Sequence, residues 1–450
     1  MLMDTDKLTD SKLLEEAIKV LKDNDHGKFI QPNKSIYPHQ WLWDSCFIAI
    51  GLAKIDVERA KLEILSLFDA QWSNGMMPNI ILHGKKEHGM VAYDRHNAIW
   101  RSWLNPNAPK GIATSGITQP PMLAEAIYQI GQKLSPLKKR EWYKQIYHPL
   151  LNYHMWLFDE RDPHREGLVL QIHPWEIGLD NTPPWMSELN DHLLPWWIRI
   201  LRDTHLDDFV GIFRSDRFLN IKNQRLTNVE ALALFSIQRR LRRKNYQFYK
   251  IIDHSLFAIE DITFNSIFIR ANQLLIEIAD FLGKKLPKDL IKQIDKSEEE
   301  LDKLWDEYAQ EYYSRDFVSH RLLKQSSIGS FMPLYSGKIK KDRASRIVAN
   351  LENEHRFGTV FPVPSAPLDS DWFQADRYWQ GPTWVNTNWL VIQGLKRYGF
   401  NDHAAALRES TIEMVKNSGF YEYFNPITGD GIGINNFSWT ASLIIDLLKD

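Results

Sequence analysis

Two short segments rich in aromatic residues contain the carboxylates best suited to acid–base chemistry. The first, residues 175–185, reads WEIGLDNTPPW and holds Glu176 and Asp180. An apolar surround raises the pKa of a carboxyl group, so that it still holds a proton near neutral pH, as a general acid must. The segment also fits a simple turn, in which Asp180 and Asn181 accept backbone hydrogen bonds.

The second segment, residues 419–433, reads GFYEYFNPITGDGIG. Its Glu422 lies between aromatic pairs, where burial of a carboxylate is costly unless the group has a partner. Such a group suits a general base that acts on a water molecule. The alternative is an exposed glutamate on a short strand whose other face holds the aromatic residues. The glycines do not form a dinucleotide-binding fingerprint, because no helix follows them.

Two further segments offer groups that bind sugars. Residues 378–389 read YWQGPTWVNTNW, and residues 37–44 read YPHQWLWD. Tryptophan presents a flat apolar face to the C–H groups of a sugar ring, while amides and carboxylates bind its hydroxyls. Each segment has a structural alternative. Asp44 fits a helix N-cap, Trp384 fits a helix core, and for Trp389 the core position is the one we predict.

Other chemistries find little support. The sequence contains no HExxH, CxxC, P-loop or GxSxG pattern, and we expect neither a metal nor a cofactor. The basic run RRLRRK at 239–244 precedes aromatic residues, a pattern also found in nucleic-acid-binding proteins. We favour basic side chains that close a helix at its negative end. The 55 Lys and Arg against 57 Asp and Glu give a charge of -2, so we expect no nucleic-acid partner.

The composition is that of a globular protein with a large core. The 450 residues are 44% hydrophobic and 25% charged. The single cysteine, Cys46, excludes an internal disulfide and fits a reducing compartment. The first residues are acidic and polar where a signal peptide needs a basic end and an apolar run, and no apolar stretch reaches membrane-spanning length. We therefore expect a cytoplasmic protein with no membrane partner.

Apolar residues at helical spacing predict about a dozen helices and very little strand. The predicted helices are 11–22, 40–53, 57–72, 121–132, 138–158, 187–201, 227–241, 262–283, 297–312, 342–352, 383–398, 402–418 and 437–449. Ser297 with Glu300 matches a capping box, the pair at 120–121 places prolines in a first helical turn, and Gly419 follows a helix end.

The connections between these helices alternate in length. Short ones fall near 53–57, 132–138 and 398–402, and long ones at 73–118, 160–186, 202–226, 313–341, 353–382 and 419–436. Long loops in a compact domain are commonly functional. The alternation predicts an all-α fold, a single (α/α)6 barrel over residues 1–450, with loops 73–118 and 160–226 covering a cleft at one end. A helical solenoid would need a repeat of fixed length, which the sequence lacks.

Five segments taken together resemble glycoside hydrolase family 63, above all its compact bacterial members, the mannosylglycerate and glucosylglycerate hydrolases. They are WLWD at 41–44, HPWEIGLDN at 173–181, FNSIF at 264–268, RYWQGPTWVNTNW at 377–389, and the FYEYFNP, GIG and FSWT pieces of 420–440. The likeness runs from about residue 30 to the C-terminus, in the order and spacing of the family. No single segment would make it specific.

The resemblance implies an (α/α)6 barrel that hydrolyses an α-glycosidic bond with inversion. The implied substrate is glucosylglycerate or mannosylglycerate, cleaved to free sugar and glycerate. Asp180 falls at the position of the family's general acid and Glu422 at that of its general base. In an inverting enzyme the two carboxyl groups stand roughly 6.5–9.5 Å apart, with room for a water.

The resemblance also implies substrate-binding residues. Those around the terminal sugar are Tyr37, Trp41, Asp44, Gln119, Trp175, Tyr378, Trp379 and Trp384. Tyr93 lies in the long loop 73–118, which resembles a mobile lid. The glycerate carboxylate needs a cation, and Arg214, with Arg217 close by, is the candidate because a guanidinium binds a carboxylate through two hydrogen bonds.

Several alternatives stay open. Within the same fold, a neutral α-glucoside or a trehalose-like disaccharide is the nearest rival substrate. A sugar epimerase or isomerase would use histidine for proton transfer, and a noncatalytic carbohydrate-binding protein would need the tryptophans without the paired carboxylates. The expected partner is a small glycoside. A homo-oligomer is possible, since exposed loop aromatics can form an interface.

Overall fold

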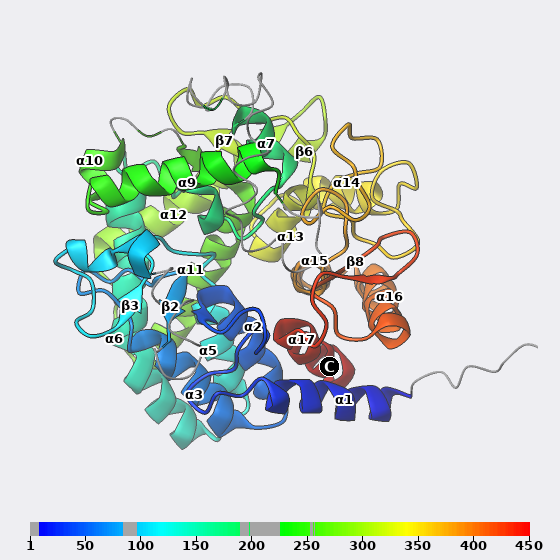
Figure 1. Cartoon of the computed structure of the whole chain (residues 1–450), viewed down its shortest axis with the longest axis horizontal. Coiled ribbons are helices and arrows are strands. Elements are labelled where there is room, and N and C mark those ends of the chain that lie inside the picture. The colour runs from blue at the N-terminus through cyan, green and yellow to red at the C-terminus, as the bar shows by residue number, and fades with distance from the viewer. Residues whose placement is uncertain (1–8, 84–96, 190–197, 199–225, 253–254, 256) are drawn as a thin grey trace, which may run out of the picture.

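Helices of the computed structural model, which describes residues 9–83, 97–189, 198, 226–252, 255 and 257–450, form two concentric rings (Figure 1). The inner ring comprises α2 (Leu42–Leu52), α5 (Leu123–Gln132), α11 (Ile262–Leu282), α13 (Met332–Ser336), α15 (Val385–Arg397) and α17 (Ser438–Lys449). Each inner helix packs against the next in this order, and α17 packs against α2. The ring is therefore closed, and the predicted (α/α)6 barrel is confirmed.

Outer helices pack around this ring, and each precedes an inner helix in the sequence. They are α1 (Asp10–Asp23), α3 (Val57–Phe68), α6 (Pro136–Arg161), α12 (Lys288–Asp302), α14 (Lys341–Leu351) and α16 (Asn401–Ser418). The two sets differ in burial. Every residue of α2 is buried, whereas α1 buries only Leu13, Ala17, Val20 and Leu21, one stripe at helical spacing.

The seam between α2 and α17 is closely packed. A Cβ atom at Gly51 would lie 2.0 Å from the backbone oxygen of Ser442, so only glycine fits there. The Ser442 hydroxyl contacts the carbonyl oxygen of Ile48 at 2.7 Å. On the other side of α17, the Trp389 indole donates a hydrogen bond to Asp446 at 2.8 Å. Helices from opposite ends of the sequence are thus joined by direct contacts.

Strands are few and short, as predicted. The one sheet of three strands joins β1 (Gln40–Trp41), β2 (Ile80–Leu82) and β3 (Ala113–Thr114), all antiparallel. The two-stranded pairs are β4 (Ile259–Glu260) with β7 (Arg315–Asp316), β5 (Trp305–Asp306) with β6 (Glu311–Tyr312), and β8 (Tyr423–Phe424) with β9 (Gly431–Ile432). Because β1 runs directly into α2, the sheet fixes Trp41 at the start of an inner helix.

The long connections enter the inner helices at their N-termini, while short turns leave them at the other end. The long connections also hold η2 (Pro174–Glu176), α7 (Pro183–Glu188), α9 (Asn228–Arg243) and α10 (Phe248–Ile252). Segments far apart in the sequence, such as 37–44, 174–181 and 378–384, therefore meet at one end of the barrel. The predicted long connection 202–226 lies almost entirely outside the described residues.

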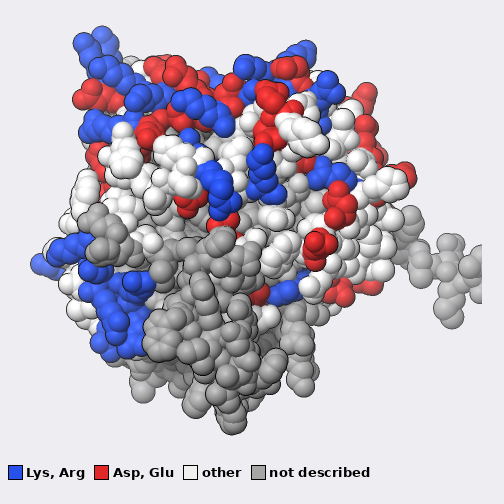
Figure 2. All heavy atoms as spheres, turned by 90° about the horizontal axis from the view of Figure 1, so that it is seen from above, with Lys and Arg blue, Asp and Glu red and all other residues white. Residues whose placement is uncertain are grey.

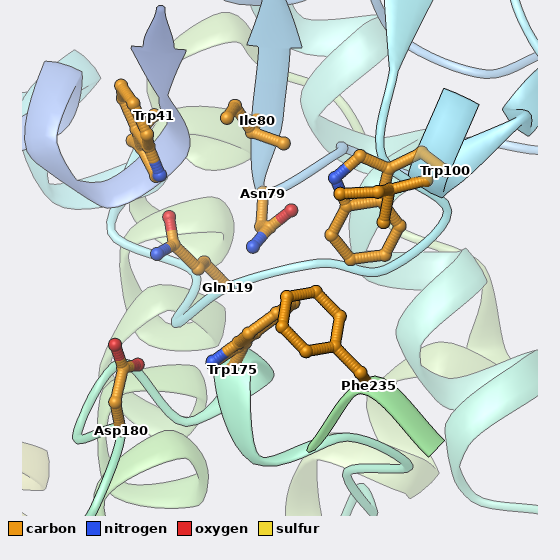
Figure 3. Close-up of a pocket in the computed structure, with 9 residues that line it drawn as sticks. Trp41, Asn79, Ile80, Trp100, Gln119, Trp175, Asp180 and Phe235 are labelled. Carbon is orange, nitrogen blue, oxygen red and sulfur yellow. The ribbon is translucent and has the colours of Figure 1, made fainter. Parts of the chain in front are cut away.

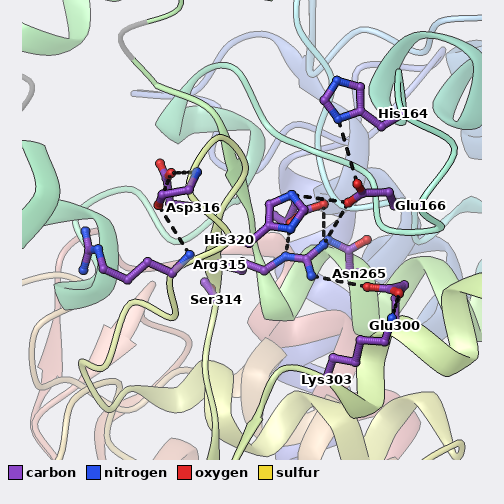
Figure 4. A network of polar contacts seen from close by, with 12 residues as sticks. His164, Glu166, Asn265, Glu300, Lys303, Ser314, Arg315, Asp316 and His320 are labelled. Carbon is purple, nitrogen blue, oxygen red and sulfur yellow. Dashed lines mark hydrogen bonds and ion pairs between the residues drawn. The ribbon is translucent and has the colours of Figure 1, made fainter.

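An ion-pair network around Arg315 ties one of these connections to the barrel (Figure 4). Arg315 contacts Glu300 of α12 at 3.3 Å and Glu166 at 3.5 Å, and it pairs with Glu260 across β4 and β7. His320 also contacts Glu166, at 3.4 Å. Since Glu166 lies between α6 and the segment 175–185, the network anchors the approach to that segment.

Most predicted helices agree with the observed ones to within a few residues, but 297–312 was wrong, and the predicted connection 313–341 contains the inner helix α13. Helix α12 begins at Lys288 and ends at Asp302, and β5 and β6 follow. Ser297 caps nothing: it lies within α12, and its hydroxyl donates to the carbonyl oxygen of Gly167 at 2.6 Å. The prolines at 120–121 precede α5 rather than beginning it. Most of the predicted helix 187–201 lies outside the described residues.

The surface carries mixed charge. Figure 2 shows acidic and basic side chains interspersed over the described part of one face. The basic run at 239–244 closes α9, as predicted, and Arg242 donates hydrogen bonds to the carbonyl oxygens of Ala98 and Ile99. No helix among the described residues has the length and apolar character needed to cross a membrane.

Candidate active site

Two adjoining cavities lie at the end of the barrel where the long connections meet. The inner pocket, of about 140 Å³, is lined by Pro32, Tyr37, Trp41, Trp43, Asp44, Gln119, Gly178, Asp180, Tyr378, Trp379, Glu422, Phe437 and Trp439. The outer cavity, of about 240 Å³, is lined by Trp41, Asn79, Ile80, Ile99, Trp100, Gln119, Trp175, Asp180 and Phe235 (Figure 3). Trp41, Gln119 and Asp180 line both, so Asp180 lies at the boundary between them.

Glu422 lines only the inner pocket. It is 2% exposed, and the Tyr37 hydroxyl donates a hydrogen bond to its Oε1 at 3.1 Å. Gly433 has a φ of +76°, and a Cβ atom there would lie 2.9 Å from the Glu422 Oε2. This glycine of the GDGIG sequence therefore makes room for the carboxylate. The alternative of an exposed glutamate is wrong.

Asp44 is a second buried carboxylate of the inner pocket. It lies in the first turn of α2, whose N-cap position is held by Trp41, so Asp44 is not the N-cap. Burial raises the pKa of Asp44 well above its ordinary value, and the charges of Glu422 and Asp180 raise it further. A protonated Asp44 can donate a hydrogen bond to a ligand hydroxyl as well as accept one.

The segment that carries Asp180 is shaped by its neighbours. Gly178 has a φ of +78°, and a Cβ atom there would lie 2.7 Å from the Trp43 ring. Asn181 joins this segment to residues 379 and 380, which are distant in the sequence. Its side-chain oxygen accepts a hydrogen bond from the Trp379 N–H at 2.9 Å, and its carbonyl accepts one from Gln380 at 2.8 Å. The half-buried Asp180 faces the two cavities.

Glu176, four residues earlier, is held within the protein and lines neither cavity. Its Oε1 accepts hydrogen bonds from Arg161 at 2.7 Å and from the Thr118 N–H at 3.2 Å, and its Oε2 accepts one from the Ile172 N–H at 2.8 Å. Burial raises the pKa of Glu176, against the opposing charge of Arg161. This carboxylate connects the segment 172–180 to the residues beside Gln119.

A stack of aromatic rings supports one wall of the inner pocket. Trp379 lies parallel to Trp384, with ring centroids 3.7 Å apart, and Trp384 in turn stacks on Tyr423 at 4.7 Å. The Trp384 indole donates a hydrogen bond to the carbonyl oxygen of Tyr378 at 3.0 Å. Trp384 is thus buried behind Tyr378 and Trp379. The resemblance implied that Trp384 lines the sugar pocket, but it is not among the lining residues. Trp389 lies in the core, as predicted.

The outer cavity has aromatic walls. Trp175 lies edge-on to Trp100, at 5.9 Å between ring centroids, and to Phe235, at 6.1 Å. Sequence reasoning did not name Asn79, Trp100 or Phe235 as site residues. The signal for Asn79 and Trp100 was their place in the loop 73–118, which was expected to cover the cleft, whereas the 44% exposure of Phe235 on α9 is known only from the structure.

Three predicted binding residues, Tyr93, Arg214 and Arg217, lie outside the described residues. Neither Lys, Arg nor His occurs among the described residues that line the two cavities. Among these described lining residues, no histidine offers the proton transfer that the epimerase interpretation needs. Within the same described residues, no cluster of His, Cys, Asp and Glu has the arrangement to hold a metal ion.

Comparison with known proteins adds a family to this geometry. The sequence profile of the "Mannosylglycerate hydrolase MGH1-like glycoside hydrolase domain" matches residues 37–440. The chain belongs to this family. The match runs from Tyr37 in the inner pocket to the first turn of α17, and it includes the segments that carry Asp180 and Glu422.

Members of the family are similar along almost their full length. A mannosylglycerate hydrolase from Thermus thermophilus is 35% identical over 96% of this chain and 99% of its own. A glucosylglycerate hydrolase from Mycolicibacterium hassiacum is 29% identical over 98% of each chain. The crystal structure of a GH63 mannosylglycerate hydrolase from Thermus thermophilus, in complex with Tris and D-glycerate, superposes with a TM-score of 0.83 over 96% of this chain, at 34% identity.

Proposed function

We propose that the protein hydrolyses glucosylglycerate or mannosylglycerate with inversion at the anomeric carbon, releasing free sugar and glycerate. One observation carries the proposal. Asp180 lines both cavities, whereas Glu422 lines only the inner pocket. A general acid must reach the oxygen between the two halves of the substrate, and a general base must reach the far face of the sugar.

The roles of the two carboxylates follow from these positions. With the sugar in the inner pocket, Asp180 donates its proton to the glycosidic oxygen as the bond from that oxygen to the anomeric carbon breaks. Glu422 takes a proton from the water that attacks the anomeric carbon from the opposite face. The Tyr37 hydroxyl, bonded to Glu422, fixes the orientation of the base. An α-glycoside therefore yields the β-anomer of the sugar.

The inner pocket has the groups that a sugar requires. Tyr378 and Trp379 offer aromatic surface, and Asp44 and Gln119 offer donors and acceptors for hydroxyls. The Gln119 side-chain oxygen contacts the Trp43 N–H at 3.4 Å, which orients its amide. Glucose and mannose differ in the direction of one hydroxyl, and the relatives include hydrolases of both conjugates.

The outer cavity takes the aglycone in this proposal. Glycerate is the aglycone named for the relatives, and D-glycerate is bound in the structure of the Thermus thermophilus enzyme. Its carboxylate needs a cation, and Arg214 and Arg217 remain the predicted source. The three tryptophans of the cavity enclose the small carbon chain and exclude water from the glycosidic oxygen.

A second candidate substrate is a neutral α-glucoside. The described residues that line the outer cavity include three tryptophans and a phenylalanine and no cation, a composition that also suits an uncharged aglycone. This candidate keeps the same acid, base and stereochemistry. It differs in which substrate the outer cavity selects.

The test follows the anomeric proton by NMR from the first seconds of reaction. The protein and its Asp180→Asn variant are incubated separately with glucosylglycerate, mannosylglycerate and methyl α-glucoside. We expect the wild-type protein to release the β-anomer from a glycerate conjugate, and Asp180→Asn to release none in the same time. Early release of the α-anomer would contradict inversion, and cleavage of methyl α-glucoside alone would favour the neutral substrate.

A further inference from the structure

Asn79 occupies a fixed place on the wall of the outer cavity. Its N–H donates a hydrogen bond to the carbonyl oxygen of Ile117 at 2.8 Å, and its carbonyl accepts one from the Leu42 N–H at 3.0 Å. The residue therefore bridges the start of β2 to the first residue of α2. Figure 3 shows its amide directed into the space between Gln119, Trp100 and Trp175.

The side chain of Asn79 is buried, and its oxygen has no partner among the described residues. It is 5% exposed, and its Oδ1 is buried with no hydrogen bond to any residue that the structure describes. Buried amides in proteins are normally paired, because an unpaired one loses its hydration without compensation. Asn105 follows that rule: it donates to the carbonyl oxygen of Asn245 and accepts from the Asn107 N–H. Asn79 is instead kept ready for a group that enters the cavity.

Few side chains of the outer cavity can accept a hydrogen bond. The indole nitrogens of Trp41, Trp100 and Trp175 are donors only. The Gln119 oxygen already contacts the Trp43 N–H, and Asp180 is committed to protonating the glycosidic oxygen. Among the described lining residues, the Asn79 Oδ1 is the acceptor left for a hydroxyl of the aglycone.

Resting on the proposed function, we infer that Asn79 determines aglycone specificity by accepting a hydrogen bond from the free hydroxyl of glycerate. One glycerate hydroxyl is used in the glycosidic bond, and the other has no role in the chemistry. A site that pairs a buried acceptor with a ligand hydroxyl discriminates against a ligand that lacks it, because the acceptor is then left unpaired. Lactate is that ligand, since it keeps the carboxylate and lacks the second hydroxyl.

The experiment compares two conjugates of the same sugar, one with glycerate and one with lactate. The wild-type protein should prefer the glycerate conjugate in kcat/KM by at least about tenfold. Asn79→Leu keeps the side-chain size and removes the amide, and Asn79→Ala removes it without adding bulk. Both variants should bring the preference to within about threefold, chiefly by losing activity on the glycerate conjugate.

Two controls separate this role from a structural one. Ile80→Val shortens a side chain of the same wall without changing a polar group, so it should change kcat/KM for both conjugates by the same factor. The Tm of Asn79→Leu should equal or exceed that of the wild-type protein, because the amide has no partner to lose among the described residues. A fall in Tm together with an unchanged preference would mark Asn79 as structural.

Failure of the proposed function and failure of the inference about Asn79 give different results. If the folded wild-type protein cleaves neither acid conjugate, the proposed function fails and the inference falls with it. If the wild-type protein cleaves the glycerate conjugate but both Asn79 variants keep its preference over the lactate conjugate, only the inference fails. Equal kcat/KM values of the wild-type protein for the two conjugates would also overturn the inference.

Discussion

The inner pocket and the outer cavity share Asp180 but differ in the elements that line them. Trp43 and Asp44 of α2 and Trp439 of α17 line the inner pocket from the closed ring, and β1 and the connections supply the rest of its lining. The outer cavity is lined mainly from connections, together with Phe235 of the outlying α9. Binding residues are often placed on loops that a rigid scaffold positions.

The two cavities also differ in their polar groups. Three carboxylates face the inner pocket, while aromatic rings and two amides dominate the outer cavity. The difference suggests a division of labour, in which the inner pocket holds the reacting groups and the outer cavity selects the aglycone. Substitution of a reacting group in the inner pocket should accordingly lower kcat, and substitution in the wall of the outer cavity should raise KM.

The largest expected effect is on the reaction itself. Glu422→Gln removes the proposed base while its amide oxygen can still accept the Tyr37 hydrogen bond, so the fold should persist. We expect kcat to fall by about 10²- to 10⁴-fold, the usual contribution of a positioned acid or base. Steady-state hydrolysis with a Tm measurement checks this. Asp376→Asn, an exposed carboxylate outside both cavities, is the matched control, and an equal loss there would contradict the assignment.

A second prediction contrasts the two carboxylates of one segment. Glu176→Gln leaves the buried Arg161 without its counter-charge, which should lower the free energy of unfolding by about 3–5 kcal/mol. Asp180→Asn should change it little, because Asp180 faces the cavities. Urea denaturation of both variants measures the contrast. Adding Arg161→Met to Glu176→Gln should restore part of the stability, and no restoration would mean that the ion pair is not the cause.

The third prediction concerns a charged group behind the inner pocket. Glu63 accepts hydrogen bonds from the Ser45 hydroxyl at 2.6 Å and the Ile30 N–H at 2.8 Å, and it pairs with Arg59 at 3.2 Å. Ser45 follows Asp44 in α2. Burial raises the pKa of Glu63 from 4.5 to about 7, against the opposing charge of Arg59.

The sign of the pH effect follows from this shift. A raised pKa means that the folded state binds the proton more tightly, so the stability from Glu63 is complete below pH 4.5 and is lost as pH rises through about 7. The loss should be about 3 kcal/mol. Urea denaturation between these pH values measures the free energy of unfolding as a function of pH. That free energy should decline less steeply in Glu63→Gln than in the wild-type protein. Phe235→Ala, at the outer cavity, should show the same pH dependence as the wild-type protein.

The smallest expected effect lies at the mouth of the outer cavity. Phe235 is half-exposed and its ring lies edge-on to that of Trp175, so Phe235→Ala removes part of one wall. We expect a loss of about 1 kcal/mol in substrate binding, seen as a roughly fivefold rise in KM with kcat nearly unchanged. Steady-state kinetics on a glycerate conjugate measures it. A large fall in kcat would break the proposed division between the two regions.

The sequence predicted the reacting carboxylates because local signals mark them. Glu422 lies between aromatic residues beside glycines, and Asp180 lies in a turn rich in tryptophan and proline. The helical spacing likewise predicted most helices of the double ring, but not the short inner helix α13, which lies in the predicted connection 313–341. These features are properties of short segments, and they need no knowledge of distant contacts.

Long-range contacts set what the sequence could not predict. Whether Glu176 or Asp180 faces the substrate depends on Arg161 of α6 and on the Thr118 N–H, neither of which is near in sequence. Asn79 carries no motif, and its importance appears only when the outer cavity is assembled. The misplaced start of α12 has a different origin, because Pro287 at its N-cap and the buried Leu290 and Ile294 at helical spacing are local signals.

The seam between α2 and α17 has a consequence for synthesis of the protein. Gly51 and Ser442 touch, yet almost the whole chain separates them. A nascent chain can form α2 early, but its apolar surface stays uncovered until α17 has left the ribosome. The inner pocket, which needs Trp439 beside Trp43 and Phe437 beside Trp439, can therefore assemble only after α17 has been synthesised. Until then the apolar surface of α2 is exposed in the growing chain, a state in which aggregation competes with folding.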